Sequence, residues 1–218
     1  MNISILLTAT VNIQQKEYIF QRNPKDRLNS YLKSVVQWLQ KTSFKITLVE
    51  NSGYSFPELQ PYLEKYSDRF EIISFVEQEI PEASFIKKCV SKGSSEMFSI
   101  DYAYYQSRFL RYSDFIIKVT CRFFIPDFES YLNNEHIEDY DSICQNDRMR
   151  CEMVGCKTIF FHKLFNIYMI NEDNVLLPWS EAIFKFRINT FFKKPLICKT
   201  LPIERTQRGG CMVPYTHL

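Results

Sequence analysis

Polar side chains follow four short apolar runs in the first half of this 218-residue chain. Any one of them alone also fits an ordinary loop cap, but together they suit the carboxyl ends of strands that hold a polar ligand. We therefore expect a ligand site at this edge of the sheet. The residues are Thr8, Thr10 and Asn12, then Glu50, Asn51 and Ser52, then Glu77 and Gln78, then Thr120 and Arg122.

The spacing of apolar residues predicts the elements that position these side chains. Four β-branched, apolar runs predict buried strands, at 3–7, 44–49, 70–76 and 115–119. Between them lie segments with helical spacing, at 24–39, 57–66 and 95–112. Asn23 and Pro24 are a typical N-cap and first residue for the first helix. This alternation predicts an α/β fold with a mostly parallel central sheet that is flanked by helices and buried on both faces.

The pattern is looser after residue 120. We expect a short helix at 127–134, a strand at 141–145 and a helix at 179–192. The tail from Pro195 is expected to be a strand and a loop that wrap back over the domain. Because the chain has no internal repeat and no low-complexity linker, we predict a single domain, residues 1–218.

Composition excludes several classes of protein. With 27 Lys and Arg against 25 Asp and Glu, the net charge is +2, which gives no field that would favour nucleic-acid binding. No apolar run approaches the roughly 20 residues of a membrane span, and the first residues resemble a buried strand more than a signal peptide. Seven cysteines without zinc-site spacing predict reduced, buried thiols. We therefore expect a cytoplasmic protein.

Familiar catalytic motifs are missing from the sequence. It has neither G-x-G-x-x-G nor G-x-x-x-x-G-K-[ST], which disfavours dinucleotide oxidoreductases and P-loop NTPases. It also has no G-x-S-x-G, which disfavours α/β-hydrolases. The three histidines are far apart in the sequence, so a zinc site is not expected.

Three short motifs resemble those of GT-A-type glycosyltransferases of bacterial surface-polysaccharide (capsule or lipopolysaccharide) biosynthesis. They are the strand end Glu50-Asn51-Ser52-Gly53, the basic loop Lys92-Gly93-Ser94-Ser95-Glu96 and the strand that runs from Asp114 to Arg122. The resemblance covers residues 3–125 well and the rest weakly. It implies a Rossmann-like, GT-A-like domain whose residues 1–125 bind a nucleotide-sugar donor and whose residues 126–218 face the acceptor.

The resemblance also implies roles for individual residues. Many GT-A enzymes hold a divalent metal ion with Asp-x-Asp after the fourth strand, but here Arg122 stands at that place. We expect Arg122 to replace the metal ion, with help from Lys92 or Lys118, although Lys118 equally fits a strand residue that faces solvent. A literal Asp-x-Asp occurs at Asp139 and Asp141; we interpret it as a solvated turn, and the alternative is an Mn²⁺ or Mg²⁺ site. The implied donor-binding residues are Thr8, Thr10, Asn12, Glu50, Asn51, Ser52, Lys92, Gly93, Lys118 and Arg122.

The acceptor side is implied by the segment Pro178-Trp179-Ser180-Glu181. Ser180 can cap a helix, Trp179 can stack on a sugar, and Glu181 can accept a hydroxyl proton. Glu181 equally fits a first-turn residue that complements the helix dipole, and Glu152 and Glu204 are weaker candidates for the base.

Aromatic and basic residues alternate at 184–194. They predict either a buried helix or a surface that contacts the inner membrane, where lipid-linked glycan acceptors lie. The function expected is glycosyl transfer, with inversion, from a nucleotide sugar to a saccharide or lipid-linked saccharide. The alternatives are a non-catalytic α/β binding or assembly protein with a GT-A-like frame, and a nucleotidyltransferase.

Overall fold

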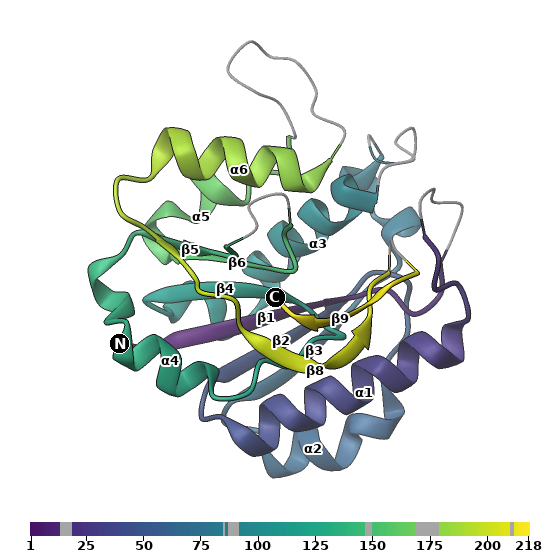
Figure 1. Cartoon of the computed structure of the whole chain (residues 1–218). Helices are drawn as coiled ribbons and strands as arrows, with labels where there is room; N and C mark the ends of the chain where they lie inside the picture. The colour runs from purple at the N-terminus through teal and green to yellow at the C-terminus, as the bar shows by residue number, and fades with distance from the viewer. Residues whose placement is uncertain (14–18, 85, 87–91, 147–149, 169–178, 210–211) are drawn as a thin grey trace.

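A seven-stranded sheet forms the centre of this protein (Figure 1). The structure is a computed structural model, and it describes residues 1–13, 19–84, 86, 92–146, 150–168, 179–209 and 212–218. The strand order is β3-β2-β1-β4-β6-β5-β7. Every pair in the sheet is parallel except that β6 runs antiparallel to β4 and to β5. The mostly parallel sheet predicted from the sequence is confirmed. The strands are β1 (Ile3–Ala9), β2 (Lys45–Glu50), β3 (Phe70–Ser74), β4 (Phe115–Thr120), β5 (Ser142–Cys144), β6 (Met153–Lys157) and β7 (Pro195–Ile197).

Helices cover both faces of the sheet, as Figure 1 shows. On one face α1, α2 and α4 pack on a core that includes Trp38 and Phe128. On the other face α3, α5 and α6 pack on a second core that includes Met97 and Phe165. Alternate residues of β1 enter the two cores, so this strand is buried from both sides. The helices are α1 (Pro24–Lys41), α2 (Gln60–Lys65), α3 (Lys92–Gln106), α4 (Phe128–Asn134), α5 (Phe161–Leu164) and α6 (Ser180–Phe191).

The first helix begins where the sequence predicts. The Asn23 side chain accepts a hydrogen bond from the backbone N–H of Lys25 at 2.9 Å, and Pro24 is the first helical residue. An N-cap of this kind typically contributes about 1 kcal/mol. We expect Asn23→Ala to lower the free energy of unfolding by about 1 kcal/mol in urea denaturation, whereas Asn23→Asp should change it far less. Equal stability of the alanine variant and the wild type would contradict the capping role.

Two features of the second half were not predicted. Strand β6 has no strand-like run of apolar residues, and it holds Gly155 where a Cβ atom would lie 2.5 Å from the carbonyl oxygen of Ile116. Its place between β4 and β5 therefore depends on a close backbone approach that only glycine allows. The tail also forms a separate two-stranded sheet of β8 (Pro202–Gln207) and β9 (Pro214–His217).

Helix α6 is mostly a packing helix. Phe184 and Arg187 are buried, and Arg187 donates hydrogen bonds to the backbone carbonyls of Leu164, Asn166 and Tyr168. Burial lowers the pKa of Arg187 to about 10. These contacts bury one side of the segment, as the buried-helix interpretation of 184–194 expects, while Lys185, Lys193 and Lys194 are exposed. Among the described residues, no helix is long and apolar enough to span a membrane.

The cysteines that the structure describes behave as predicted. All five are buried and free of disulfides, and they are Cys121, Cys144, Cys151, Cys156 and Cys198. Burial raises the pKa of the thiols of Cys121, Cys151, Cys156 and Cys198, and that of Cys151 reaches about 12. These four thiols are therefore protonated packing groups.

Candidate active site

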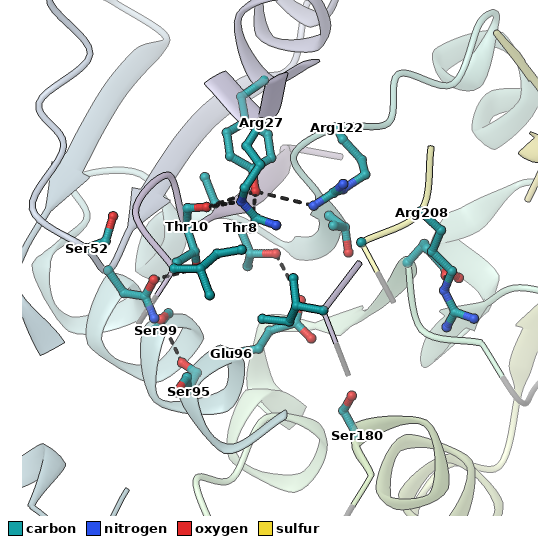
Figure 2. Close-up of a pocket in the computed structure, with 18 of the residues that line it drawn as sticks. Thr8, Thr10, Arg27, Ser52, Ser95, Glu96, Ser99, Arg122, Ser180 and Arg208 are labelled. Carbon is teal, nitrogen blue, oxygen red and sulfur yellow. Dashed lines mark hydrogen bonds and ion pairs between the residues drawn. The ribbon is translucent and has the colours of Figure 1, made fainter. Parts of the chain in front are cut away.

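A cavity of about 1080 Å³, counted with its part open to solvent, lies at the carboxyl ends of β1 and β4. Figure 2 shows the polar side chains that point into it. Residues from the strand ends, α1, the start of α3, the start of α6 and the segment after β8 all contribute to its wall. The lining residues are Thr8, Ala9, Thr10, Asn12, Ile13, Ile19, Arg27, Tyr31, Asn51, Ser52, Glu77, Gln78, Ser95, Glu96, Ser99, Thr120, Arg122, Phe123, Cys151, Glu152, Ser180, Glu181, Arg208 and Gly209.

One end of the cavity carries two buried arginines. The guanidinium carbons of Arg27 and Arg122 each lie 5.6 Å from the ring centre of Tyr31. Both groups donate to the Tyr31 hydroxyl, at 2.7 and 3.4 Å, and Figure 2 shows them converging. Burial lowers the pKa of Arg27, and the positive charge of Arg122 acts in the same direction. Two like charges are thus held close together and away from water; we call this the arginine pair.

The arginine pair forms no ion pair in the described part of the chain, although Arg27 and Arg122 are both at most 6% exposed. The negative charge of the buried Glu50 acts on Arg27 and raises its pKa, but burial outweighs this effect. Arg122 instead donates to the Gln21 side chain and the Gln207 carbonyl, and its Nε is buried without a hydrogen-bond partner. Buried charges in proteins are normally paired. This end of the cavity therefore suits an anionic ligand.

A hydrogen-bond network joins the predicted strand-end residues. The Thr10 hydroxyl donates to the Asn51 side-chain oxygen at 2.6 Å, and the Asn51 amide donates to Glu77 at 2.8 Å. Ser95 donates to the other oxygen of Glu77 at 2.9 Å. The backbone N–H of Asn12 donates to the Ser52 hydroxyl at 2.9 Å. The ends of β1, β2 and β3 and the start of α3 therefore form one fixed polar wall.

Glu50 has a different place from the one predicted. Its carboxylate is fully buried, does not line the cavity and accepts hydrogen bonds from the backbone N–H groups of Val11, Ser52 and Tyr54 at 2.8–2.9 Å. The Ser52 hydroxyl donates to it as well. Glu50 therefore holds together the two loops that form the cavity wall and does not reach the cavity space itself.

Lys118 also lies behind the wall. It is 0% exposed, so the alternative that it faces solvent is wrong. Its ammonium group lies 2.6 Å from Glu96 and donates to the Cys151 carbonyl at 2.8 Å. Burial lowers the pKa of Lys118, but the negative charge of Glu96 outweighs it and the pKa is raised overall. Lys118 stays charged and fixes Glu96, which also accepts from Thr8 at 3.0 Å.

Another part of the cavity carries acidic residues, and we call it the acidic end. Arg208, from the segment after β8, lies 2.6 Å from Glu152 through its Nε and 3.1 Å from Glu181 through Nη2. Ser180 donates to the second oxygen of Glu181 at 3.3 Å. The N-cap position belongs to Trp179, so the predicted capping role of Ser180 is wrong. The structure therefore brings Glu181 and Glu152 to one cavity, together with an arginine that the sequence analysis overlooked.

Several predicted residues do not line the cavity. Trp179 is 64% exposed beside Glu181, and Glu204 forms an exposed ion pair with Lys33. Gly93 lies buried in the first turn of α3. Lys92 opens that helix, but its side chain lies outside the described part of the structure.

Asp139 and Asp141 lie far from the carboxyl edge of the sheet. They precede β5, which runs in the same direction as β4, so they sit at the amino-terminal edge, opposite the cavity. Asp139 is exposed, and Asp141 accepts from the backbone N–H of Lys194 at 3.3 Å. Within the described ranges, no three His, Cys, Asp or Glu residues cluster to hold a metal ion. These aspartates do not fit the role of metal ligands for a phosphate bound in the cavity.

The sequence analysis missed Arg27, Tyr31, Glu96 and Arg208 as cavity residues. Arg27 and Tyr31 are four residues apart on α1 and so share one helix face, which is a signal that the sequence contains. Arg208 follows a strand with no clear pattern, and only the fold brings it to Glu152 and Glu181.

Comparison with known proteins gives distant likenesses only. No family model and no curated protein matches this chain. Similar solved structures include one described as a nucleotide-diphospho-sugar transferase from Desulfovibrio desulfuricans G20 (13% identity, TM-score 0.47, 91% of this chain and 80% of that one). Others are S. aureus TarS 1-349 (11%, 0.46, 92% and 59%) and a cytidylyltransferase from Leptospira borgpetersenii serovar Hardjo-bovis (10%, 0.48, 91% and 76%). These values are too low to assign a family or a ligand.

Proposed function

We propose that this protein is a glycosyltransferase that moves a sugar from a nucleotide-sugar donor to a saccharide or lipid-linked saccharide in surface-polysaccharide assembly. The observation that carries the proposal is the arginine pair, two buried guanidinium groups that form no ion pair among the described residues. A donor diphosphate supplies the missing negative charge. The motifs that resemble GT-A glycosyltransferases point to the same ligand.

The rest of the cavity suits such a donor. The polar wall of Thr10, Asn51 and Ser52 offers hydrogen bonds to a ribose or base, and Ile13 and Ile19 offer an apolar surface. As the sugar is transferred, negative charge develops on the departing diphosphate. Arginines fixed in a site shielded from water stabilise this charge without having to reorganise. In this proposal Arg122 and Arg27 stabilise the negative charge of the diphosphate, which many GT-A enzymes stabilise with a metal ion.

We expect nucleotide binding that does not depend on a divalent metal ion. Isothermal titration with UDP, GDP and CMP should give the same affinity within about twofold with Mn²⁺ and with EDTA, because arginine forks can hold the diphosphate. Absence of binding to all three nucleotides would contradict the proposed function. A strict need for Mn²⁺ would contradict only the replacement of the metal by arginine.

Two further measurements separate the alternatives: a titration with CTP and an assay of nucleotide release from a nucleotide sugar. A nucleotidyltransferase should prefer a triphosphate such as CTP to UDP. A non-catalytic binding protein should bind nucleotide and release none from a nucleotide sugar. Cytoplasmic location and contact with the membrane surface, through Lys185, Lys193 and Lys194 on and after α6, are further parts of the proposal, since these side chains are exposed.

A further inference from the structure

The acidic end of the cavity contains a buried oxygen atom that has no partner among the described residues. Oε2 of Glu152 is shielded from solvent and accepts no hydrogen bond from the part of the chain that the structure describes, whereas Oε1 is held 2.6 Å from Nε of Arg208. Glu152 is only 4% exposed and lines the cavity. A buried carboxylate oxygen without a donor costs free energy, and such exceptions in native proteins call for an explanation. A ligand that brings a hydrogen-bond donor would satisfy this oxygen.

The other carboxylates of the cavity differ from Glu152. Glu77 accepts from Asn51 and Ser95 with its two oxygens. Glu181 accepts from Arg208 and from Ser180 with its two oxygens. Glu96 meets the buried Lys118 and Thr8 through Oε1. Among the described residues that line the cavity, Glu152 is the carboxylate with a buried oxygen that has no hydrogen-bond partner.

We propose that Glu152, and not Glu181, is the catalytic base that accepts the proton of the acceptor hydroxyl. The assignment rests on the proposed function. In the transfer step the acceptor O–H bond breaks and its proton moves to Oε2 of Glu152, while the acceptor oxygen bonds to the anomeric carbon. The bond from that carbon to the diphosphate oxygen breaks, and its electron pair leaves with the diphosphate toward the arginine pair.

Arg208 is a positioning residue in this proposal. It lies between Glu152 and Glu181 and donates its Nη1 to the Tyr215 hydroxyl at 3.3 Å, so three groups fix its guanidinium. By holding Oε1 of Glu152 it turns Oε2 toward the acceptor. Glu181 and Tyr215 act only through Arg208. Loss of positioning of this kind typically lowers the rate by one or two orders of magnitude.

The test uses the full chain with UDP-glucose, UDP-N-acetylglucosamine and GDP-mannose, and it measures nucleoside diphosphate release with water as acceptor. A positioned base typically contributes 10²–10⁴-fold. Glu152→Gln should therefore lower kcat by about 100-fold or more, keep the Kd for UDP within about twofold and abolish the acid limb of the pH–rate profile. Glu181→Gln should lower kcat by about tenfold and keep that limb.

A pair of Arg208 variants tests the positioning role. Arg208→Lys should recover part of the activity that Arg208→Gln loses. Turnover by Glu152→Gln within threefold of the wild type, or a larger loss in Glu181→Gln, would overturn the assignment. A wild-type protein that binds UDP but releases no nucleotide from any of the three nucleotide sugars would also overturn the assignment, because there would be no transfer step in which Glu152 accepts a proton. Failure of the wild type to bind any nucleotide would instead overturn the proposed function.

Discussion

Arg122→Ala is expected to weaken the binding of UDP or GDP by about 100-fold, which corresponds to a loss of about 3 kcal/mol. The physical reason is that the variant removes one of two buried guanidinium groups that form no ion pair in the described chain and would face an anionic ligand. The Nε–H of Arg122 is a buried donor without a hydrogen-bond partner among the described residues. Isothermal titration at constant ionic strength measures the change.

Two controls make the result for Arg122 specific. Arg122→Lys keeps the charge and loses the planar fork, so it should lie between the alanine variant and the wild type. Arg111→Ala removes an exposed arginine near the start of β4, at the opposite edge of the sheet, and should leave binding unchanged. Thermal unfolding checks that the contacts of Arg122 with Gln21 and Gln207 are not the cause. An affinity within threefold of the wild type would show that Arg122 does not hold the ligand.

Glu50→Ala should lower the free energy of unfolding by about 3–5 kcal/mol, a large effect for one residue. The variant removes the acceptor of the buried N–H group of Val11 and of the part-buried N–H groups of Ser52 and Tyr54. A buried group without its partner costs about 1–3 kcal/mol. These groups belong to the loops after β1 and β2, so the cavity wall should loosen as well. Urea denaturation followed by circular dichroism measures the loss.

Glu50→Gln is the matched variant. It keeps one acceptor oxygen and the size of the side chain, so its stability should fall between those of the wild type and Glu50→Ala. The structure predicts that any loss of nucleotide affinity follows the loss of stability. A Glu50→Gln protein of wild-type stability that no longer binds nucleotide would instead support the direct donor contact expected from the sequence.

The regular first half of the fold was predictable because each element there has a local signal. Strand β2 is an apolar run that ends at Glu50, and α1 begins at Asn23 and Pro24. Strand β6 has no such signal. Its residues become a strand because β4 and β5 offer hydrogen bonds on both sides and because Gly155 lets the backbones approach.

The candidate site was predictable in its location and less so in its roles. Parallel strands end at one edge, so Thr10, Asn51 and Arg122 could be expected together. The sequence could not show that Glu50 and Lys118 bind partners inside the protein and do not reach the cavity, because these partners come from other loops and from α3. Nor could it show that Arg208 reaches Glu152, since the contact joins residues 56 positions apart.

The segment after β8 has a consequence for synthesis of the chain. Gln207 and Arg208 touch Arg122, Glu152 and Glu181, and Gly209 accepts a hydrogen bond from Phe20 at 2.8 Å. While the ribosome is still making residues 1–200, β1 to β4 can already pair and α1 can dock, but the cavity has no closing wall. Nascent chains can therefore begin to bury their apolar surface before the candidate site is complete, so the stage at which aggregation is a risk comes before the stage at which the cavity closes.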